Sequence, residues 1–387
     1  MHQKPRPDGL YCPNPDCSLF GQVEAGQLER HAYYGPKRVP QYLCRGCGKT
    51  FSETKGTFFY RLRTEREQVL KALAIVAEQG GIRATARVTG FDKDTIQRWV
   101  DRAGKHAEEV SAYMIVECDL TEAQLDELWT FVKKKDRNLT EEEDPQEVGE
   151  FYVWRCIKRD TKLRVAAHVG QQEEESVNGL LEKVEERRTK RTDPLYVSDG
   201  GTSIPPAMLT VLGQEVEEGS HQGPRWKKPR REPGEGILYA RMIKQRDAQG
   251  HLISILEEVT WGEEALVWQR IDPEGEGRHI STFCIERDNL TARLHNSRLA
   301  RKTLRFSKQR YMLERSVALE DAYYNFCLPH DTLKKRIDPP RPTNGNGSAK
   351  KWAPCTPMMA EGLTDHVWTL EELLAFRVPP RHVWSEF

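Results

Sequence analysis

Between residues 64 and 105 the hydrophobic positions recur at the spacing of short helices. In the first helix they fall three and four residues apart, at Val69, Leu70, Leu73, Val76 and Ala77. Gly80 and Gly81 end this helix. A second helix is predicted over 82–89, stopping at Gly90, and a third begins after Asp92, which is a good N-cap residue.

From residue 124 the pattern changes to the alternation that is typical of strands. Strands are predicted over 124–132, 151–158 and 163–169, followed by an amphipathic helix over 173–188 and a short apolar strand over 195–198 that leads into Asp199. Three strands, a helix and a further strand ending in an acidic residue is the element order of an RNase H-like core, whose sheet mixes antiparallel and parallel strands. The order by itself does not decide the fold.

The next segments read as a hairpin and two helices. Alternating residues over 237–244 and 251–259 predict a β-hairpin, which we interpret as part of an insertion, 214–278, that a minimal core would not need. Helices are predicted over 282–299 and from 308 to about 326.

The last part of the chain is predicted to be a linker and a tail. The stretch 338–357 is rich in Pro, Gly and Asn, and a short final helix begins near Thr369. This tail either docks on another domain or a second subunit, or packs within its own chain.

Length and composition favour a soluble globular protein. The 387 residues, 37% hydrophobic and 30% charged, suggest about two or three domains and argue against wholesale disorder. No stretch approaches the about 18 uncharged apolar residues of a membrane span, and the N-terminus lacks the apolar core of a signal peptide. We therefore expect no membrane association and a cytoplasmic protein. The net charge is zero, but residues 1–105 hold 18 Lys or Arg against 11 Asp or Glu.

Four of the nine cysteines form two pairs near the N-terminus, Cys12 with Cys17 and Cys44 with Cys47. This is zinc-ribbon spacing, because each short loop can place two thiolates on one side of a tetrahedral ion. Four protein ligands leave no open coordination position, so the predicted Zn²⁺ is structural. The alternative is four unrelated buried or free cysteines.

The third helix of the 64–105 segment is predicted to contact DNA. Helix, short helix, glycine turn and basic polar helix is the helix-turn-helix arrangement, in which the last helix enters the major groove. A three-helix bundle with a basic solvent face would read similarly, but the adjoining zinc ribbon and the local positive charge favour DNA. The side chains expected to project toward it are Lys93, Thr95, Gln97, Arg98 and Arg102.

Further motifs run through most of the chain. They are Asp126-Glu127-Leu128-Trp129, the Arg159-Asp160 pair of the first hairpin, Ser198-Asp199-Gly200, 285–290 (IERDNL) with Arg293-Leu294, the basic run 301–308, the segment 83–87 (RATAR) and 324–330 (YNFCLPH). Together with the cysteine pairs, these motifs resemble the transposases of the insertion sequence one family.

The resemblance implies a recombinase with an Asp-Asp-Glu catalytic triad at Asp126, Asp199 and Glu286. Phosphoryl transfer on DNA uses two divalent cations about 3.5 to 4 Å apart, and carboxylates are suitable ligands for Mg²⁺. We therefore expect these three residues to bind two Mg²⁺ ions, with Mn²⁺ able to substitute. The alternative for each is a solvated surface carboxylate.

Two other acids compete for these roles. Asp119 lies close upstream of the first strand, but Asp-Glu-x-Trp is the family's motif and favours Asp126. Asp288 is two positions from Glu286 on one predicted helix and is therefore expected on a different face. Beyond Glu286, a basic segment is expected to hold DNA phosphates, with a solvated helix face as the alternative. Its residues are Arg293, Arg301, Lys302, Arg305 and Lys308.

The sequence thus predicts a multidomain protein, with a zinc ribbon over 1–60, a helix-turn-helix domain over 61–117, an RNase H-like catalytic domain over 118–336 and a tail over 337–387. The predicted function is a nucleoid-associated transposase that binds the terminal inverted repeats of its element and its target DNA, as a homodimer or higher oligomer when the ends are paired. One alternative is a catalytically inactive, transposase-derived DNA-binding protein. A third is a nuclease of the same fold that cuts without joining.

Overall fold

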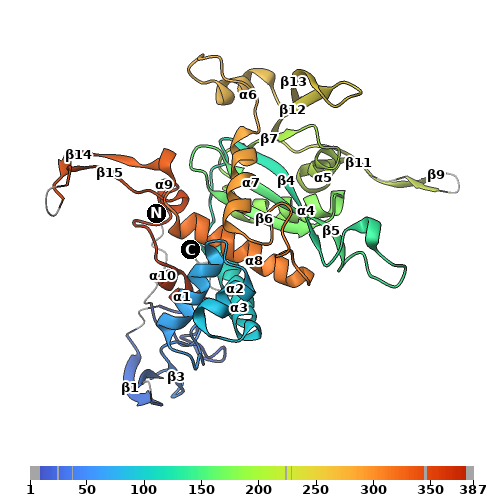
Figure 1. Ribbon diagram of the computed structural model, residues 1–387. Helices are drawn as coiled ribbons and strands as arrows, with labels where there is room; N and C mark the ends of the chain where they lie inside the picture. The colour runs from blue at the N-terminus through green and yellow to red at the C-terminus, as the bar shows by residue number, and fades with distance from the viewer. Residues whose placement is uncertain are drawn as a thin grey trace. The chain divides into compact units, whose positions relative to one another are not determined.

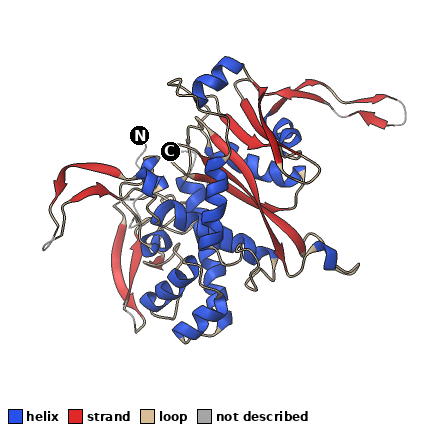
Figure 2. Cartoon of the chain, turned by 45° about the horizontal axis from the view of Figure 1, so that its top comes forward, coloured by secondary structure: helices blue, strands red, loops and turns tan. Residues whose placement is uncertain are grey.

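The computed structural model describes residues 9–23, 26–36, 38–222, 225–227, 229–343 and 347–380. The ends of the predicted zinc ribbon and tail, 1–8 and 381–387, lie outside these ranges. The chain forms two compact units. Figures 1 and 2 show the helices and strands of the chain. Unit 1 consists of residues 1–114 with 318–387, and unit 2 of residues 115–317. The tail and the last part of the predicted catalytic domain therefore group with the N-terminal segments.

Unit 1 begins with an antiparallel sheet of order β1-β2-β3, whose strands are Leu28–Tyr34, Val39–Cys44 and Thr50–Ser52. Three helices follow: α1 (Arg66–Ala77), α2 (Ile82–Thr89) and α3 (Lys93–Met114). Gly90 ends α2 in a left-handed conformation at φ 77°, which glycine adopts without strain. The bounds predicted for α2 and the predicted start of α3 are confirmed.

The second part of unit 1 corrects the predicted linker. Two parts of the stretch 338–357 form strands: 338–341 belong to β14 and 350–353 to β15, and the two strands pair antiparallel. The elements of this part are η2 (Tyr323–Cys327), η3 (Asp331–Leu333), β14 (Lys335–Arg341), β15 (Lys350–Ala353), α9 (Pro357–Ala360) and α10 (Leu370–Ala375). The helix predicted near Thr369 is confirmed, and Thr369 closes a capping box at its start.

The tail packs within its own unit, which was the second of the two alternatives. The backbone N–H of Phe58 donates to the carbonyl of Leu374 (3.1 Å), and the hydroxyl of Tyr11 donates to the carbonyl of Val378 (2.8 Å). Arg377 donates to the carbonyls of Lys55 (3.2 Å) and Gly9 (3.0 Å). The C-terminal segment therefore holds the N-terminal segment in place.

Unit 2 is built on a six-stranded mixed sheet of order β13-β12-β7-β4-β5-β6. Strands β4, β5 and β6 are antiparallel neighbours, whereas β7 is parallel to both β4 and β12. The strands are β4 (Ala123–Val132), β5 (Gly149–Lys158), β6 (Arg164–Gly170), β7 (Leu195–Asp199), β12 (Leu238–Arg246) and β13 (Leu252–Trp261). The predicted mixed α/β class is confirmed, and Figure 2 shows helices beside this sheet.

The remaining elements of unit 2 are helices and short strands. Helix α4 packs against β5 and β6, α7 against β4 and β5, and α6 against β12. Their bounds are η1 (Asp136–Asn138), α4 (Glu174–Arg187), α5 (Ile204–Leu212), β8 (Gly213–Glu217), β9 (Ser220–Gln222), β10 (Arg225–Lys227), β11 (Arg230–Pro233), α6 (Glu264–Ile271) and α7 (Phe283–His295), with α8 (Arg310–Ala322) running on into unit 1. One core lies where Leu128 of β4 and Ala292 of α7 meet Leu313 of α8.

Two sequence predictions for unit 2 are wrong. The first concerns the proposed insertion: β12 continues the main sheet by pairing with β7, from Leu238 opposite Leu195 to Met242 opposite Asp199. Residues 238–242 are therefore part of the core, whose Leu238 and Ala240 are buried. The second concerns the helix predicted over 282–299, which ends at His295.

Candidate functional site

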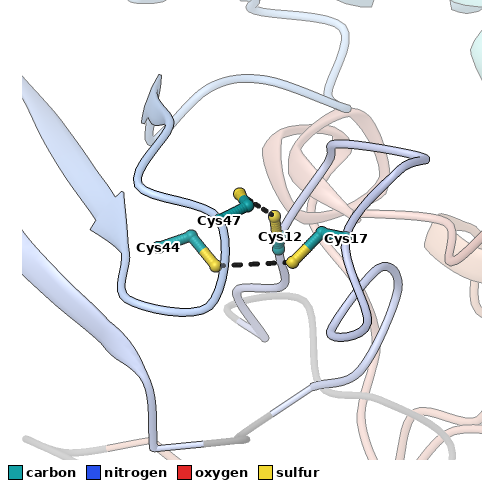
Figure 3. A group of neighbouring side chains, drawn as sticks. All are labelled: Cys12, Cys17, Cys44 and Cys47. Atoms are coloured by element: carbon teal, nitrogen blue, oxygen red, sulfur yellow. Dashed lines mark hydrogen bonds between the residues drawn. The ribbon is translucent and has the colours of Figure 1, made fainter.

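A cluster of four cysteines in unit 1 is the first candidate site (Figure 3). The Sγ atoms of Cys12 and Cys47 lie 3.7 Å apart, those of Cys17 and Cys44 lie 3.8 Å apart, and all four lie within 4.8 Å of one another. Tetrahedral Zn²⁺ with Zn–S bonds of about 2.3 Å places its sulfurs roughly 3.8 Å apart. The four thiols are therefore close enough to bind a metal such as zinc.

The local backbone explains why these cysteines meet. Cys44 ends β2, and the turn that follows it is closed by a hydrogen bond from the N–H of Gly48 to the carbonyl of Cys44 (2.8 Å). A Cβ on Gly46 would lie 2.8 Å from the Leu19 side chain, so a larger residue there would require Leu19 to shift. The backbone N–H of Lys49 lowers the pKa of Cys47 to about 7, which favours the thiolate that binds metal.

A group of carboxylates in unit 2 is the second candidate site. Strands β4 and β7 pair in parallel, with Leu125 opposite Ser198, so the next residues, Asp126 and Asp199, lie side by side. Oxygens of Asp126, Glu127 and Asp199 all lie within 4.8 Å of one another. The structure thus brings together two of the three predicted catalytic acids, and it adds Glu127.

Glu127 joins this group because of where the two strands separate. Successive side chains of a strand point to opposite faces, so the pattern alone places Glu127 away from Asp126. The pairing of β4 with β7 ends at Leu125, and beyond this point a carboxylate can reach around the free edge of β4. Sequence reasoning missed Glu127 because this edge depends on strand pairing.

Burial and like charge dominate the electrostatics of the group. Burial, followed by the charges of Glu127 and Asp199, raises the pKa of Asp126 to about 7. The pKa of Glu127 is also raised, by burial and by Asp199. Asn289 on α7 donates to Asp126 (2.8 Å), and the N–H of Gly201 donates to Asp199 (2.9 Å). Neighbouring carboxylates that disfavour each other's ionised form are a suitable environment for a divalent cation.

Helix α7 is fixed against β4 by a buried glutamine. Gln124 accepts a hydrogen bond from the N–H of Ile285 (3.0 Å) and donates to the carbonyl of Ser281 (2.7 Å). Gln124 and Asp126 share one face of β4, because they are two residues apart. The first turn of α7 therefore lies beside Gln124, and Asp126, two residues further along β4, contacts Asn289 in the next turn.

Glu286 is the third predicted catalytic acid. Among the described residues, the carboxylate group consists of Asp126, Glu127 and Asp199 and does not include Glu286. Oε1 of Glu286 accepts hydrogen bonds from Nζ of Lys244 on β12 (2.6 Å) and from the hydroxyl of Thr282 (3.0 Å). Burial opposes ionisation of Glu286, but Lys244 and Thr282 together lower its pKa. Its charge nevertheless contributes to the raised pKa of Asp126, so it lies within electrostatic reach of the group.

The two competing acids have other partners. Asp119 accepts a hydrogen bond from the hydroxyl of Thr192 (2.7 Å). Asp288 is buried and accepts from Nε of Arg164 with both of its oxygens, at 2.9 and 3.0 Å. Asp288 therefore lies on a different face of α7 from Glu286, as the sequence predicted.

The predicted DNA contacts on α3 differ in exposure. Lys93 and Arg98 are exposed, whereas Thr95 and Gln97 are half-buried. The expectation that Arg102 projects outward is wrong, because its guanidinium lies 5.3 Å from the centre of the Phe58 ring and donates to the carbonyl of Tyr60. Arg102 therefore holds unit 1 together.

The second set of predicted DNA contacts lies on and beyond α7. Arg293 is on α7 and half-buried, while Arg301, Lys302 and Arg305 are exposed in the irregular segment between α7 and α8. Exposed Lys308 places its Nζ 3.1 Å from the centre of the Phe306 ring. The basic residues from 301 on therefore lie outside α7, which ends at His295.

Comparison with known proteins does not assign a family. No family model matches the chain, and no curated protein matches it. Within the described residues, no helix combines the length and the apolar character needed to cross a membrane.

Proposed function

We propose that this protein is a DNA transposase, in which the cysteine module and helices α1–α3 bind the ends of the element and unit 2 cleaves and joins DNA. One observation supports the proposal: Asp126 and Asp199, which the family motifs single out, come together from two separate strands in a half-buried carboxylate group. Three antiparallel strands extended by parallel β7 and β12 support an RNase H-like core.

The donor atoms fit the predicted cofactor. Carboxylate oxygens are the ligands that Mg²⁺ prefers, and Asp126, Asp199 and Glu127 supply them here. Bound Mg²⁺ would activate the attacking hydroxyl and stabilise the leaving oxygen. Asn289 orients Asp126 through its hydrogen bond, and Gly201 does the same for Asp199. The exposed basic side chains at 301–305 can hold the phosphates of DNA.

The alternative is a transposase-derived DNA-binding protein without catalysis. Its specific support is the ion pair of Glu286 with Lys244, which gives the third acid a partner other than a metal. The two functions differ in one measurable respect, because only the transposase needs Asp126 and Asp199 for chemistry.

The test measures end cleavage and strand transfer in Mg²⁺ on DNA that carries the element's terminal repeats. Asp126→Asn and Asp199→Asn keep size and shape but remove a charge, so activity should fall by roughly 100-fold or more while repeat binding persists. Asp119→Asn is the matched control. Asp119 accepts a hydrogen bond from Thr192 and lies outside the carboxylate group, so this variant should stay active.

Two outcomes contradict the proposal. Strand transfer that survives in both Asp126→Asn and Asp199→Asn shows that the wrong acids were chosen. A wild-type chain that binds the repeats but never cleaves them, in Mg²⁺ or Mn²⁺, supports the inactive DNA-binding protein.

A further inference from the structure

The ribbon formed by β14 and β15 is a strongly basic surface that the proposed function leaves unused. Residues 331–353 hold six basic and two acidic side chains. All six basic residues are exposed, and none of them forms an ion pair with a described residue: Lys334, Lys335, Arg336, Arg341, Lys350 and Lys351. Figure 1 shows the ribbon extending away from α9.

The strand register sorts these cations onto two faces. Arg336 lies opposite Trp352, and Arg341 lies opposite Lys350. Residues that lie opposite each other in an antiparallel pair share a face, and so do residues two apart along a strand. One face therefore carries Arg336, Arg341, Lys350 and Trp352. Arg336 and Arg341 are five residues apart, and they share this face because the strand register shifts between them. We call these four residues, with Lys334, the Trp352 face.

Two observations distinguish the Trp352 face from an ordinary solvated surface. Trp352 is 47% exposed, although a large apolar ring gains free energy from burial. Lys334 places its Nζ 5.5 Å from the centre of the Trp352 ring, which assigns it to the same face. Four cations thus share a face with one exposed aromatic ring. Lys335 and Lys351 lie on the opposite face, with no exposed aromatic partner among the described residues.

We infer that the Trp352 face binds the sugar-phosphate backbone of double-stranded DNA, independently of α3. Its cations complement a row of phosphates, its indole can pack against a sugar or a base edge, and a two-stranded ribbon has the width that the major groove admits. The inference adds a second DNA contact to the proposed function. It rests on that function only for the choice of DNA, and not another polyanion, as the partner.

The test uses the full-length chain and a mixed-sequence DNA duplex of about 30 base pairs. Mg²⁺ and Mn²⁺ are omitted so that no cleavage occurs, and no chelator is added, so that metal bound by the cysteines stays in place. Binding is measured by fluorescence anisotropy between 50 and about 200 mM salt, the range over which phosphate contacts are revealed. The variant Arg336→Glu/Lys350→Glu reverses two charges on the Trp352 face. The matched control, Lys335→Glu/Lys351→Glu, makes the same charge change on the opposite face of the same ribbon.

The Trp352-face variant should bind at least about tenfold more weakly, and the slope of log K against log salt should fall by about two, because two phosphate contacts are lost. The control should lose less than about threefold, and Trp352→Ala should weaken binding without changing the slope. Equal losses in both charge variants would reduce the effect to overall charge and overturn the inference. Unchanged binding in the Trp352-face variant would also overturn it.

A second measurement separates DNA from an anionic membrane as the partner. Cosedimentation with vesicles of phosphatidylserine and phosphatidylcholine should be the same for the two charge variants. Loss of vesicle binding in the Trp352-face variant, with DNA binding intact, would overturn the inference. Because binding is the readout, a chain that proves inactive in cleavage but passes this test keeps the ribbon contact and loses only the proposed catalysis.

Discussion

At the scale of single residues, the carboxylate group shows how one side chain can change the chemistry of a site. Asp126 and Asp199 lie together, but Glu286 is held by Lys244 at 2.6 Å. The ammonium group supplies positive charge to Glu286 from within the chain. Lys244 therefore competes with any cation that would recruit Glu286.

We predict that Lys244→Met increases the affinity of unit 2 for divalent cations by about tenfold, because a positive charge close to the site is removed and Glu286 is released. Titration calorimetry of the full-length chain with Ca²⁺, which binds without supporting chemistry, measures this directly. Arg246→Met is the control, since it removes the same charge two residues along β12, where Arg246 contacts the carbonyl of Gly250. The same affinity in both variants would show that Lys244 does not compete.

At the scale of elements, the contact between α3 and α10 contains a buried titratable group. His106 on α3 lies beside the backbone of Leu373 and is 7% exposed. Burial, helped by the charge of Arg102, lowers its pKa to about 4. The native chain therefore keeps His106 neutral at pH values where the unfolded chain protonates its histidines.

This lowered pKa predicts a loss of stability in acid. Between pH 6.5 and 4 the unfolded state binds a proton that the native state does not, so His106 lowers the free energy of unfolding as pH falls, by up to roughly 3 kcal/mol. His106→Gln should remove this part of the pH dependence. Urea unfolding of both chains at several pH values, followed by near-UV circular dichroism, gives the difference. Parallel stability curves for the two chains across this pH range would contradict the prediction.

At the scale of the whole molecule, described segments from the N-terminal and C-terminal parts of the chain contact each other within unit 1. Arg377 binds carbonyls of Gly9 and Lys55, on either side of the cysteine cluster in sequence. The segment that holds the cysteine cluster and strands β1–β3 is small, and its buried residues include Cys12, Cys17 and Cys44. A metal bound by these cysteines would supply much of its folding free energy, and loss of the metal should also release the tail.

We predict about one zinc ion per full-length chain, and almost none after Cys44→Ser. Chelation should increase protease cleavage both within β1–β3 and after α10. Elemental analysis and limited proteolysis are the measurements. Cys355→Ser is the control, because Cys355 is equally buried in unit 1 but lies outside the cluster. Chains that lack zinc as purified, or that resist protease equally with and without chelator, would refute a structural metal.

The sequence by itself determined the features that depend on neighbouring residues. Helix α2 stops at Gly90 and α3 begins after Asp92, as the glycine and the N-cap residue predict, because these signals act within one turn of the chain. The alternation of apolar and polar residues predicted the strands of the first hairpin. The two glycines after Asp199 predicted the end of β7. The cysteine pairs lie in short loops, so their spacing predicted their meeting.

Only the tertiary structure decided the features that depend on which strands pair and which ends meet. Strand β12 pairs with β7 and so belongs to the core sheet, although the sequence suggested an insertion there. The β4–β7 pairing ends at Leu125, just before Asp126 and Glu127, whose carboxylates lie close together. The same sheet set Lys244 against Glu286, and antiparallel pairing turned a predicted linker into the β14–β15 ribbon. Each of these features depends on which strands pair and where the pairing ends, and the free energy comes from strand pairing and burial that the local pattern does not encode.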